Sequence, residues 1–491
     1  MPKTNLDLVE FLEGITASES YPVWQEFYRI SQIPRESGNE DKIIEYIASR
    51  AKTLGLKFRI DEGEKKNLVV YTPSTNGSSD TVALQSHVDM VCEKETSSQH
   101  NFLTDPIVPY VSDSFVKAQG TSLGADDGIG VAVELAIMES GDMLHPNLEL
   151  LFTVDEETGL KGAQAMKLPL KAKYLINLDS EEVDTITVGC ASAWRYKAIL
   201  PGTAPADAKK LLEIALSDFP GGHSGVQIHE TKRGNPINIM GYLLSRYQND
   251  SDHHINIKNN FLNITGGTKM NAIPRDCTVL VHPEAIYMSI EEEAKRISEH
   301  FDGAKLNVRM IDADSLDASQ TMMTMHPEQL RNALSLIHSG VLYMGTTQYC
   351  PVETSNNVGV IRTTNDGVTI EGMFRSSNAY REQMALDSIV RAFKSNHFDG
   401  VELTGYSGWE PKSDYRLLNM AVDHGKRIIG DMKISAIHAG LECGPINGAY
   451  PGMQIISIGP TIIGPHSPDE KVEIRSVEKF YNLVHALLKD L

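Results

Sequence analysis

Five stretches of the sequence place histidine and acidic side chains where they could bind metal ions. They are VALQSHVDM with His87 and Asp89, LGADDGIG with Asp126 and Asp127, FTVDEETG with Asp155, Glu156 and Glu157, LINLDSEE with Asp179, and IGPHSPDE with His466. Two histidines and several carboxylates are a suitable ligand set for two divalent cations, with one carboxylate bridging the pair. The residue types therefore predict a site for two metal ions.

The acidic run of residues 155–157 follows the apolar, strand-like segment LELLFTV. Three adjacent carboxylates repel one another, and partial burial at a strand end would add a desolvation penalty. Two dications opposite the run would offset that repulsion. If strand-like alternation continues here, Glu156 and Glu157 point to different sides, so that one can bind metal while the other acts as a base. The pattern gives Asp155 no role.

The spacing of His87 and Asp89 has its own use, because residues two apart on a strand point to the same side. We therefore expect Asp89 to orient the His87 ring. Taken singly, each candidate has a simpler explanation, since most histidines are structural and DDG is usually a turn. Strand-like runs that end in H-x-D, A-D-D-G, D-E-E-T-G and L-D, followed by a late G-P-H, are an improbable coincidence in a non-catalytic protein.

The elements that must position these residues alternate between strands and helices. Short apolar runs precede the polar groups, and helical patterns lie at residues 37–55 and 128–140. This order predicts an α/β sheet covered by helices, with polar residues gathered at the strand ends. The same alternation resumes near the C-terminus and ends in the helix SVEKFYNLVHALLKD. We predict one discontinuous α/β/α catalytic domain made of residues 1–189 and 401–491.

Residues 190–400 have a different pattern, in which strand, helix, hairpin and helix are followed by a second helix, hairpin and helix. The two hairpins, in NNFLNITGGTKMNAIPRDCTVLVH and SNNVGVIRTTNDGVTIEGMFRSS, share an NN pair, an apolar strand and a glycine-bearing turn. We predict an inserted α+β domain built from two related halves.

Composition narrows the class of protein. The 491 residues, 41% hydrophobic and 22% charged, predict a soluble globular chain of two or three domains. A net charge of -20 argues against nucleic acid or an anionic membrane as partner, which leaves a small or cationic one. There is no secretory signal pattern or membrane-spanning apolar run, and the five cysteines form no C-x-x-C pair, so we expect a cytoplasmic protein.

The order of SHVDMV, LGADDGIG, TVDEETGLKGA, INLDSEE, GGHSG, NAIPRD and HAGLECG resembles the co-catalytic zinc peptidases of the M20 clan. Within the clan, the likeness is greatest to the bacterial aminoacyl-histidine dipeptidases and spans essentially the whole chain. The resemblance implies that His87 and Asp179 bind one zinc, that Glu157 and His466 bind the other, and that Asp126 bridges them. It also implies that Asp89 orients the site and that Glu156 is the general base.

The same resemblance implies that the insertion is a lid or dimerisation domain, and a homodimer is compatible with it. His223 of GGHSG would polarise the substrate carbonyl, and Asn271 and Arg375 would bind substrate. Zinc is the implied metal, although the ligand set also accepts manganese or cobalt.

The activity implied is that of a cytosolic, metal-dependent dipeptidase that hydrolyses Xaa-His and other unblocked dipeptides through a metal-activated water. Asp179 favours this activity, since relatives that remove acyl groups often have Glu at that position. One alternative is another amidohydrolase of the clan, such as a tripeptidase or an acylamino-acid deacylase. A non-catalytic metal-bearing scaffold predicts a missing base or ligand, and none is missing. A metal-free serine hydrolase would need G-x-S-x-G, and GGHSG lacks that order.

Overall fold

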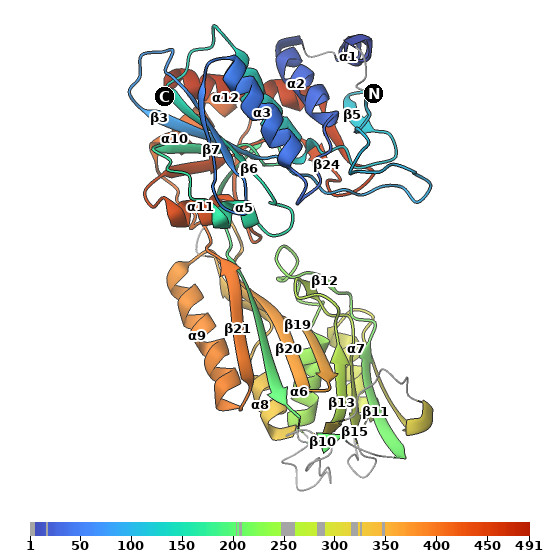
Figure 1. Cartoon of the computed structure of the whole chain (residues 1–491). Helices are drawn as coiled ribbons and strands as arrows, with labels where there is room; N and C mark the ends of the chain where they lie inside the picture. The colour runs from blue at the N-terminus through green and yellow to red at the C-terminus, as the bar shows by residue number, and fades with distance from the viewer. Residues whose placement is uncertain are drawn as a thin grey trace. The chain divides into compact units, whose positions relative to one another are not determined.

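The computed structural model describes residues 5–15, 18–202, 204–205, 209–246, 261–281, 290–315, 323–324, 327–345 and 349–491. The chain forms two compact units (Figure 1). The first unit is Met1–Gly189, Pro411–Ala436 and Leu441–Leu491, and the second unit is Cys190–Glu410 and Ile437–Gly440. The second unit continues past the predicted boundary at residue 400, because β21 (Asp399–Tyr406) pairs with β9 (Ala193–Pro201).

An eight-stranded mixed sheet forms the centre of the first unit. In sheet order its strands are β1 (Lys57–Ile60), β2 (Leu68–Thr72), β6 (Asn147–Thr153), β3 (Thr81–His87), β7 (Tyr174–Asn177), β23 (Gln454–Ser457), β8 (Thr185–Cys190) and β22 (Lys433–Ile437). Strands β6, β3, β7 and β23 are mutually parallel, whereas β1, β2 and β8 pair antiparallel. The carboxyl ends of β6, β3 and β7 therefore meet at one edge of the sheet, where ligand chemistry is expected.

Helices surround this sheet. They are α1 (Asn5–Glu13), η1 (Ser18–Ser20), α2 (Tyr21–Ser31), α3 (Asp41–Thr53), α4 (Ala125–Glu139), α5 (Lys161–Ala165), α10 (Arg416–Ile428), α11 (Cys443–Ala449) and α12 (Ile474–Asp490). Helix α4 packs on β3 and on α2, and its side chains are buried on almost every side. This placement explains why most of its residues after Asp127 are apolar. A small sheet of β24 (Ile462–Ile463), β25 (Lys471–Glu473), β5 (Phe115–Ala118) and β4 (Pro109–Ser112) completes the unit.

The second unit contains a nine-stranded antiparallel sheet. Its strands in order are β16 (Lys305–Asp312), β11 (Lys210–Ser217), β15 (Cys277–Val281), β13 (Phe261–Gly266), β19 (Val352–Thr364), β20 (Gly367–Ser376), β9 and β21, with β18 (Gly340–Met344) beside β19. The other elements are β10 (Ala204–Pro205), β12 (Gly222–His223), α6 (Pro236–Arg246), β14 (Ala272–Ile273), α7 (Ile290–His300), η3 (Ala313–Ser315), β17 (Met323–Thr324), α8 (Pro327–Leu336) and α9 (Ala379–Ser395). The buried apolar core of the unit joins residues of the sheet to residues of the helices.

Two halves of this sheet have the same topology. From the centre outward, one half is β13, β15, β11 and β16, and the other is β19, β20, β9 and β21. In each half the two strands of a hairpin lie nearest the centre of the sheet. The strand of that half that comes first in the chain lies beside the hairpin, and the strand that comes last lies at the edge. The halves meet where β13 pairs with β19. The predicted fold class, an α/β protein with a doubled α+β insertion, is confirmed. Parts of the predicted elements, such as residues 259–260 and 288–289, lie outside the described residues.

Within the described part of the chain, no helix has the length and apolar character that a membrane crossing requires.

Candidate active site

The carboxyl edge of the central sheet in the first unit collects the predicted ligands. His87 is the last residue of β3, Asp179 follows the end of β7, and the acidic run of residues 155–157 follows β6. Asp126 lies in the first turn of α4, and the peptide bond that joins it to Asp127 is cis. His466 comes from the connection between β24 and β25. Five separate segments of the chain thus contribute to one site.

Asp126 lies between the two histidines. Its Oδ1 atom is 3.1 Å from His87 Nε2, and its Oδ2 atom is 3.1 Å from His466 Nε2. Each oxygen of this carboxylate therefore faces a different histidine. This is the position that the predicted bridging ligand requires.

The remaining two ligand candidates complete a group on each side of Asp126. Asp179 Oδ1 lies 3.5 Å from His87 Nε2, and Glu157 Oε2 lies 3.2 Å from His466 Nε2. In both groups, His87 with Asp126 and Asp179, and Asp126 with Glu157 and His466, the possible ligand atoms lie within 4.8 Å of one another. The structure thus brings the five residues together as two groups that share one carboxylate.

The electrostatics of the groups reflect their opposite charges. Hydrogen bonds that the His466 ring donates to the carboxylates of Asp126 and Glu157 raise the pKa of His466 to about 11. Burial lowers the pKa of His87, but the carboxylates of Asp179 and Asp126 outweigh this effect and raise it well above its usual value. Burial alone would raise the pKa of Asp126, and the two histidines hold it below its usual range instead. The carboxylates thus attract positive charge to this site.

The donor set also fits metal ions. Imidazole nitrogens and carboxylate oxygens are ligands that zinc and similar divalent ions accept. Glu157 Oε1 is buried and has no hydrogen-bond partner among the described residues, so it has an acceptor site to offer a cation. A cluster of side chains that could bind metal is therefore present, with the composition that the sequence predicted.

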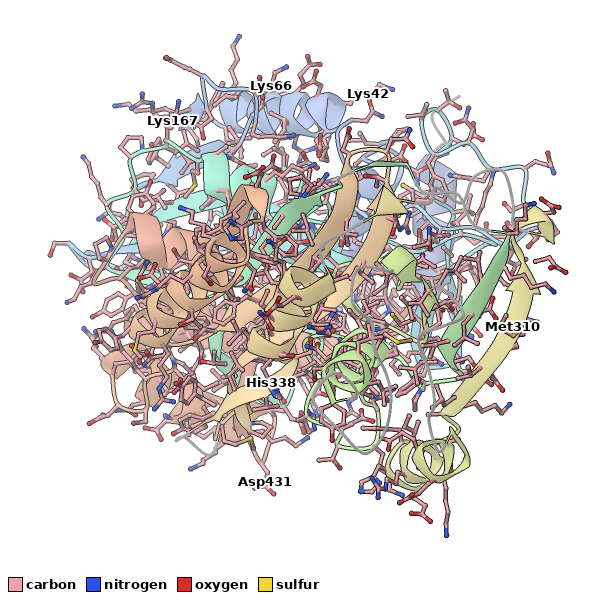
Figure 2. The ribbon with its side chains drawn as sticks, turned by 90° about the horizontal axis from the view of Figure 1, so that it is seen from below. Lys42, Lys66, Lys167, Met310, His338 and Asp431 are labelled. Atoms are coloured by element: carbon pink, nitrogen blue, oxygen red, sulfur yellow. The ribbon has the colours of Figure 1, made fainter. Side chains whose placement is uncertain are left out.

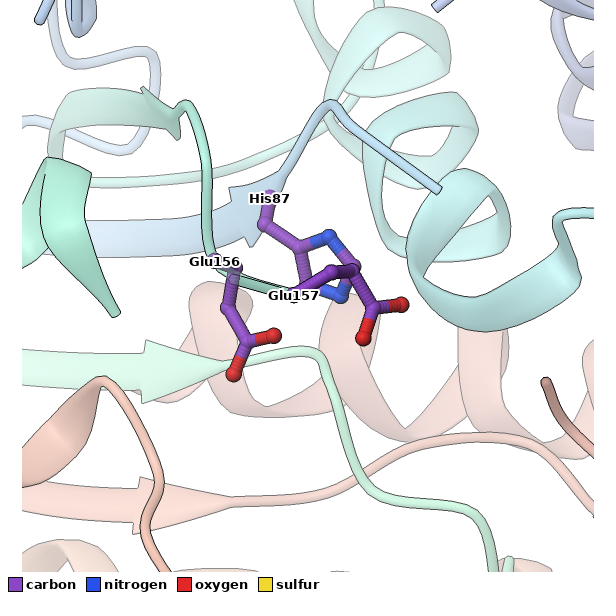
Figure 3. A group of neighbouring side chains, drawn as sticks. All are labelled: His87, Glu156 and Glu157. Atoms are coloured by element: carbon purple, nitrogen blue, oxygen red, sulfur yellow. The ribbon is translucent and has the colours of Figure 1, made fainter. Parts of the chain in front are cut away.

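Glu156 lies beside this cluster and has no part in either group that contains Asp126. Figure 3 shows its carboxyl group and that of Glu157 directed to different places near His87. Burial, with the nearby charges of Asp179 and Glu157, raises the pKa of Glu156 well above its usual value. The expected strand-like alternation is wrong here, because β6 ends at Thr153. Both glutamates lie instead in the irregular segment that follows the strand.

Asp89 has two sets of contacts. Its Oδ1 atom lies 3.5 Å from His87 Nδ1, on the ring edge opposite to the one that faces Asp126. The same carboxylate accepts hydrogen bonds from the backbone amides of Glu156 and Glu157 and from the Ser37 hydroxyl. Asp89 therefore contacts both the histidine and the acidic turn.

The three remaining candidates lie in the second unit. His223 Nδ1 accepts hydrogen bonds from the amides of Gly225 and Val226, so its Nε2 carries the proton. Burial and the charge of Arg375 lower the pKa of His223. Asn271 is exposed and lies next to His223, because β12 pairs with β14 and the Ser224 amide donates to the Asn271 carbonyl.

Arg375 is buried with an incomplete set of partners. It hydrogen-bonds Tyr406, yet its Nε has no partner among the described residues, and burial lowers its pKa. His438 lies close enough for Arg375 to help lower its pKa to about 3, after burial as the main cause, and His438 Nε2 is 2.7 Å from the Ser355 hydroxyl. Sequence reasoning missed His438, although the HAGLECG motif contains it.

Sequence reasoning also missed two buried glutamates near the predicted metal ligands. Glu470 accepts hydrogen bonds from four consecutive backbone amides, those of residues 123–126, and so holds the segment that carries Asp126. Glu442 accepts from Gln85 and Thr153 on β3 and β6. Both glutamates stand in quoted motifs, but only the tertiary structure reveals what they contact.

Comparison with known proteins identifies the class. Residues 83–490 match peptidase family M20/M25/M40. The chain belongs to this family of peptidases, and the resemblance noted in the sequence is confirmed.

Individual relatives narrow the comparison. The cytosol non-specific dipeptidase of Escherichia coli is 33% identical over 497 aligned positions, which cover 96% of this chain and 97% of the relative. The crystal structure of an aminoacylhistidine dipeptidase from Vibrio alginolyticus matches with a TM-score of 0.82 and 32% identity, over 96% of each chain. An aminopeptidase from Bacillus cereus, at 18% identity and a TM-score of 0.55 over 97% and 99% of the two chains, shares the fold.

Proposed function

We propose that this protein is a metal-dependent dipeptidase of the cytoplasm that hydrolyses unblocked dipeptides, Xaa-His peptides among them. The observation that carries the proposal is the pair of ligand groups joined at Asp126, with the carboxyl group of Glu156 beside them. The substrate class is supported by the two dipeptidases that this chain resembles over nearly its full length.

Two divalent cations, zinc by preference, would be held by the two groups. His87, Asp126 and Asp179 would hold one cation, and Asp126, Glu157 and His466 would hold the other. When bound, such a pair lowers the pKa of a water molecule and polarises the substrate carbonyl.

Glu156 would move the proton. It would accept a proton from the attacking water and pass it to the nitrogen of the leaving amine, first as a base and then as an acid. Asp89 would keep the His87 ring and the acidic turn in place through the contacts that it makes with both.

The second unit would recognise substrate. Arg375, buried with a free Nε, suits the carboxylate of a dipeptide, because a guanidinium binds such a group in a charge-assisted hydrogen bond. The proton on His223 Nε2 suits a substrate carbonyl, and Asn271 is exposed beside it.

A substrate panel with metal-stripped protein tests the function. We expect β-Ala-His and Gly-His to be hydrolysed after zinc, manganese or cobalt is added back, and a tripeptide and an N-acetyl amino acid to be poor substrates. Preference for the tripeptide would indicate a tripeptidase, and preference for the N-acetyl compound would indicate an acylamino-acid deacylase, in place of the proposed dipeptidase. No hydrolysis with any of the metals would reject the enzymatic proposal.

We propose that the second unit also supports a homodimer. Sedimentation velocity of the full chain should then give a single species of twice the chain mass, and a monomer at micromolar concentration would contradict this.

A further inference from the structure

Three consecutive backbone amides in the acidic turn donate to buried carboxylates. The Asp155 amide donates to Glu40 Oε1 at 3.0 Å, and the amides of Glu156 and Glu157 donate to Asp89 at 3.1 and 3.2 Å. Each amide is one bond from the Cα atom of its residue. The three bonds therefore fix where the side chains of Glu156 and Glu157 begin.

Asp155 holds the same turn through its side chain. The backbone of Asp155 has φ of 55°, and its carboxylate accepts a hydrogen bond from the Thr158 hydroxyl and pairs with Lys65. Lys161 Nζ lies 3.7 Å from the same carboxylate. A short polar residue is well suited to this left-handed conformation.

Glu40 connects the turn to the start of α3. Its Oε1 atom accepts a hydrogen bond from the Gly38 amide at 2.8 Å as well as the one from the Asp155 amide, and the residue is 8% exposed. One carboxylate oxygen therefore joins the segment before α3 to the turn after β6.

The carboxylates that hold the acidic turn need an opposite charge nearby. Carboxylate atoms of Glu40, Asp89 and Asp155 lie within 4.8 Å of one another, and all three residues are buried. Like charges at such a distance repel strongly when they are shielded from water. The ammonium group of Lys65 pairs directly with Asp155 and supplies the opposite charge. Lys65 is thus part of what allows the three carboxylates to lie together.

We propose that Glu40, Asp155 and Lys65 are positioning residues that hold the turn of residues 155–157, and with it the side chains of Glu156 and Glu157, in the geometry that the site needs. We call these three residues the turn clamp. The expected effect on catalysis rests on the proposed function, whereas the effects on the turn and on metal binding do not.

Lys65→Ala is the first test, and Lys66→Ala is its matched control. Lys66 is the next residue, extends from the protein surface (Figure 2) and pairs with exposed Asp41 at 2.8 Å, whereas Lys65 pairs with Asp155. Residues that orient metal ligands typically contribute about 10–100-fold to activity or metal affinity. We expect Lys65→Ala to lower kcat about tenfold with KM unchanged, and Lys66→Ala to have no effect.

Glu40 offers a conservative pair of variants. Glu40→Gln keeps an Oε1 acceptor for the Asp155 amide, whereas Glu40→Ala removes it. We expect Glu40→Ala to lower kcat with KM unchanged and Glu40→Gln to retain most of the activity. A purely structural role would instead lower thermal stability in both variants and leave the kcat of the folded fraction unchanged.

Chelator competition and amide exchange separate the turn clamp from the proposed function. In Glu40→Ala and Lys65→Ala, the binding of one of two zinc ions should be weakened about tenfold, because only one of the two ligand groups that share Asp126 contains Glu157. The peptide spanning residues 154–160 should exchange its amide hydrogens faster in these metal-free variants than in Lys66→Ala. If the wild type has no dipeptidase activity but the variants show these changes in metal affinity and exchange, only the proposed dipeptidase function is rejected. Variants that match Lys66→Ala in exchange, metal affinity and kcat would reject the turn clamp.

Discussion

The three adjacent acids of residues 155–157 have separate environments, and this separation makes their proximity tolerable. Burial raises the pKa of Asp155, but Lys65 and Thr158 outweigh it and keep that carboxyl below its usual range. Glu156 is buried beside Asp179 and Glu157, which raises its pKa. Glu157 faces His466. The repulsion that the sequence suggests is therefore reduced in three ways: Asp155 pairs with a lysine, Glu157 faces a histidine, and the pKa of buried Glu156 is raised.

Replacing Glu156 tests the proton transfer. We expect Glu156→Ala to lower kcat by about 10²–10⁴-fold, the usual contribution of a general base, while two metal ions stay bound. Glu156 belongs to neither ligand group that contains Asp126, so metal affinity should change little. Turnover with Gly-His and metal content by atomic absorption are the measurements. Near-normal turnover would contradict the role of Glu156.

Replacing Arg375 tests recognition of the substrate carboxylate. A lost hydrogen bond between charged groups weakens binding by about 1.5–3 kcal/mol, so Arg375→Ala should raise KM for Gly-His about 10–100-fold. The wild type should prefer Gly-His to its C-terminal amide, and the variant should lose this preference. Arg362→Ala, which removes an exposed arginine from β19 of the same sheet, is the control. An unchanged preference in Arg375→Ala would exclude the proposed contact.

At the scale of elements, the start of α4 depends on one carboxylate from the distant connection before β25. Glu470 is 2% exposed, and its two oxygens accept from the amides of Leu123, Gly124 and Ala125 at 2.7 to 2.8 Å and from Asp126 at 3.3 Å. A negative group at this end is also favoured by the helix dipole. Glu470 thus fixes the segment that presents the shared ligand.

Glu470→Ala should therefore reduce both stability and metal binding. With four buried amides left without their acceptor, the free energy of unfolding should fall by about 2 kcal/mol or more. Asp469→Ala removes the exposed neighbouring acid and is the control. Urea denaturation and zinc titration are the measurements. Equal stability of the two variants would show that this cap contributes little.

Sequence patterns were sufficient for residues that follow strand ends and insufficient for residues that meet only in three dimensions. His87 and Asp179 follow apolar runs whose parallel pairing brings their ends together. Glu470 contacts Asp126 from far along the chain, and Glu40 contacts Asp155 from the segment before α3. No periodicity links such pairs. The alternation expected at Glu156 is wrong because β6 ends at Thr153 and Asp155, which has a left-handed conformation, follows it.

At the scale of the whole molecule, the second unit shows how a repeat can be present in topology and faint in sequence. Strand β9 belongs by sheet order with β19, β20 and β21, although the other half of the sheet follows it in the chain. One half is therefore inserted into the other. The two strands of each hairpin lie close together in sequence, and their shared pattern predicts the repeat. Strand β9 is separated from its hairpin, β19 and β20, by the whole other half, so the sequence pattern does not connect them.

The stability of the whole chain should depend on pH in opposite ways with and without metal. Asp126 and Glu157 raise the pKa of His466 from 6.5 to about 11, so the protonated histidine stabilises the metal-free fold fully below pH 6.5. That contribution is lost as pH rises toward 11. A bound cation would replace the proton, and its binding should strengthen with pH because the proton competes with it. We expect Tm of the chelated protein to fall between pH 7 and pH 10, as thermal scans can show, and the stabilisation by saturating zinc to grow over the same range. His466→Ala should weaken both trends, and His87, whose pKa is also raised, should account for the remainder. A chelated wild type whose Tm rises over this range would contradict the charge arrangement described for the site.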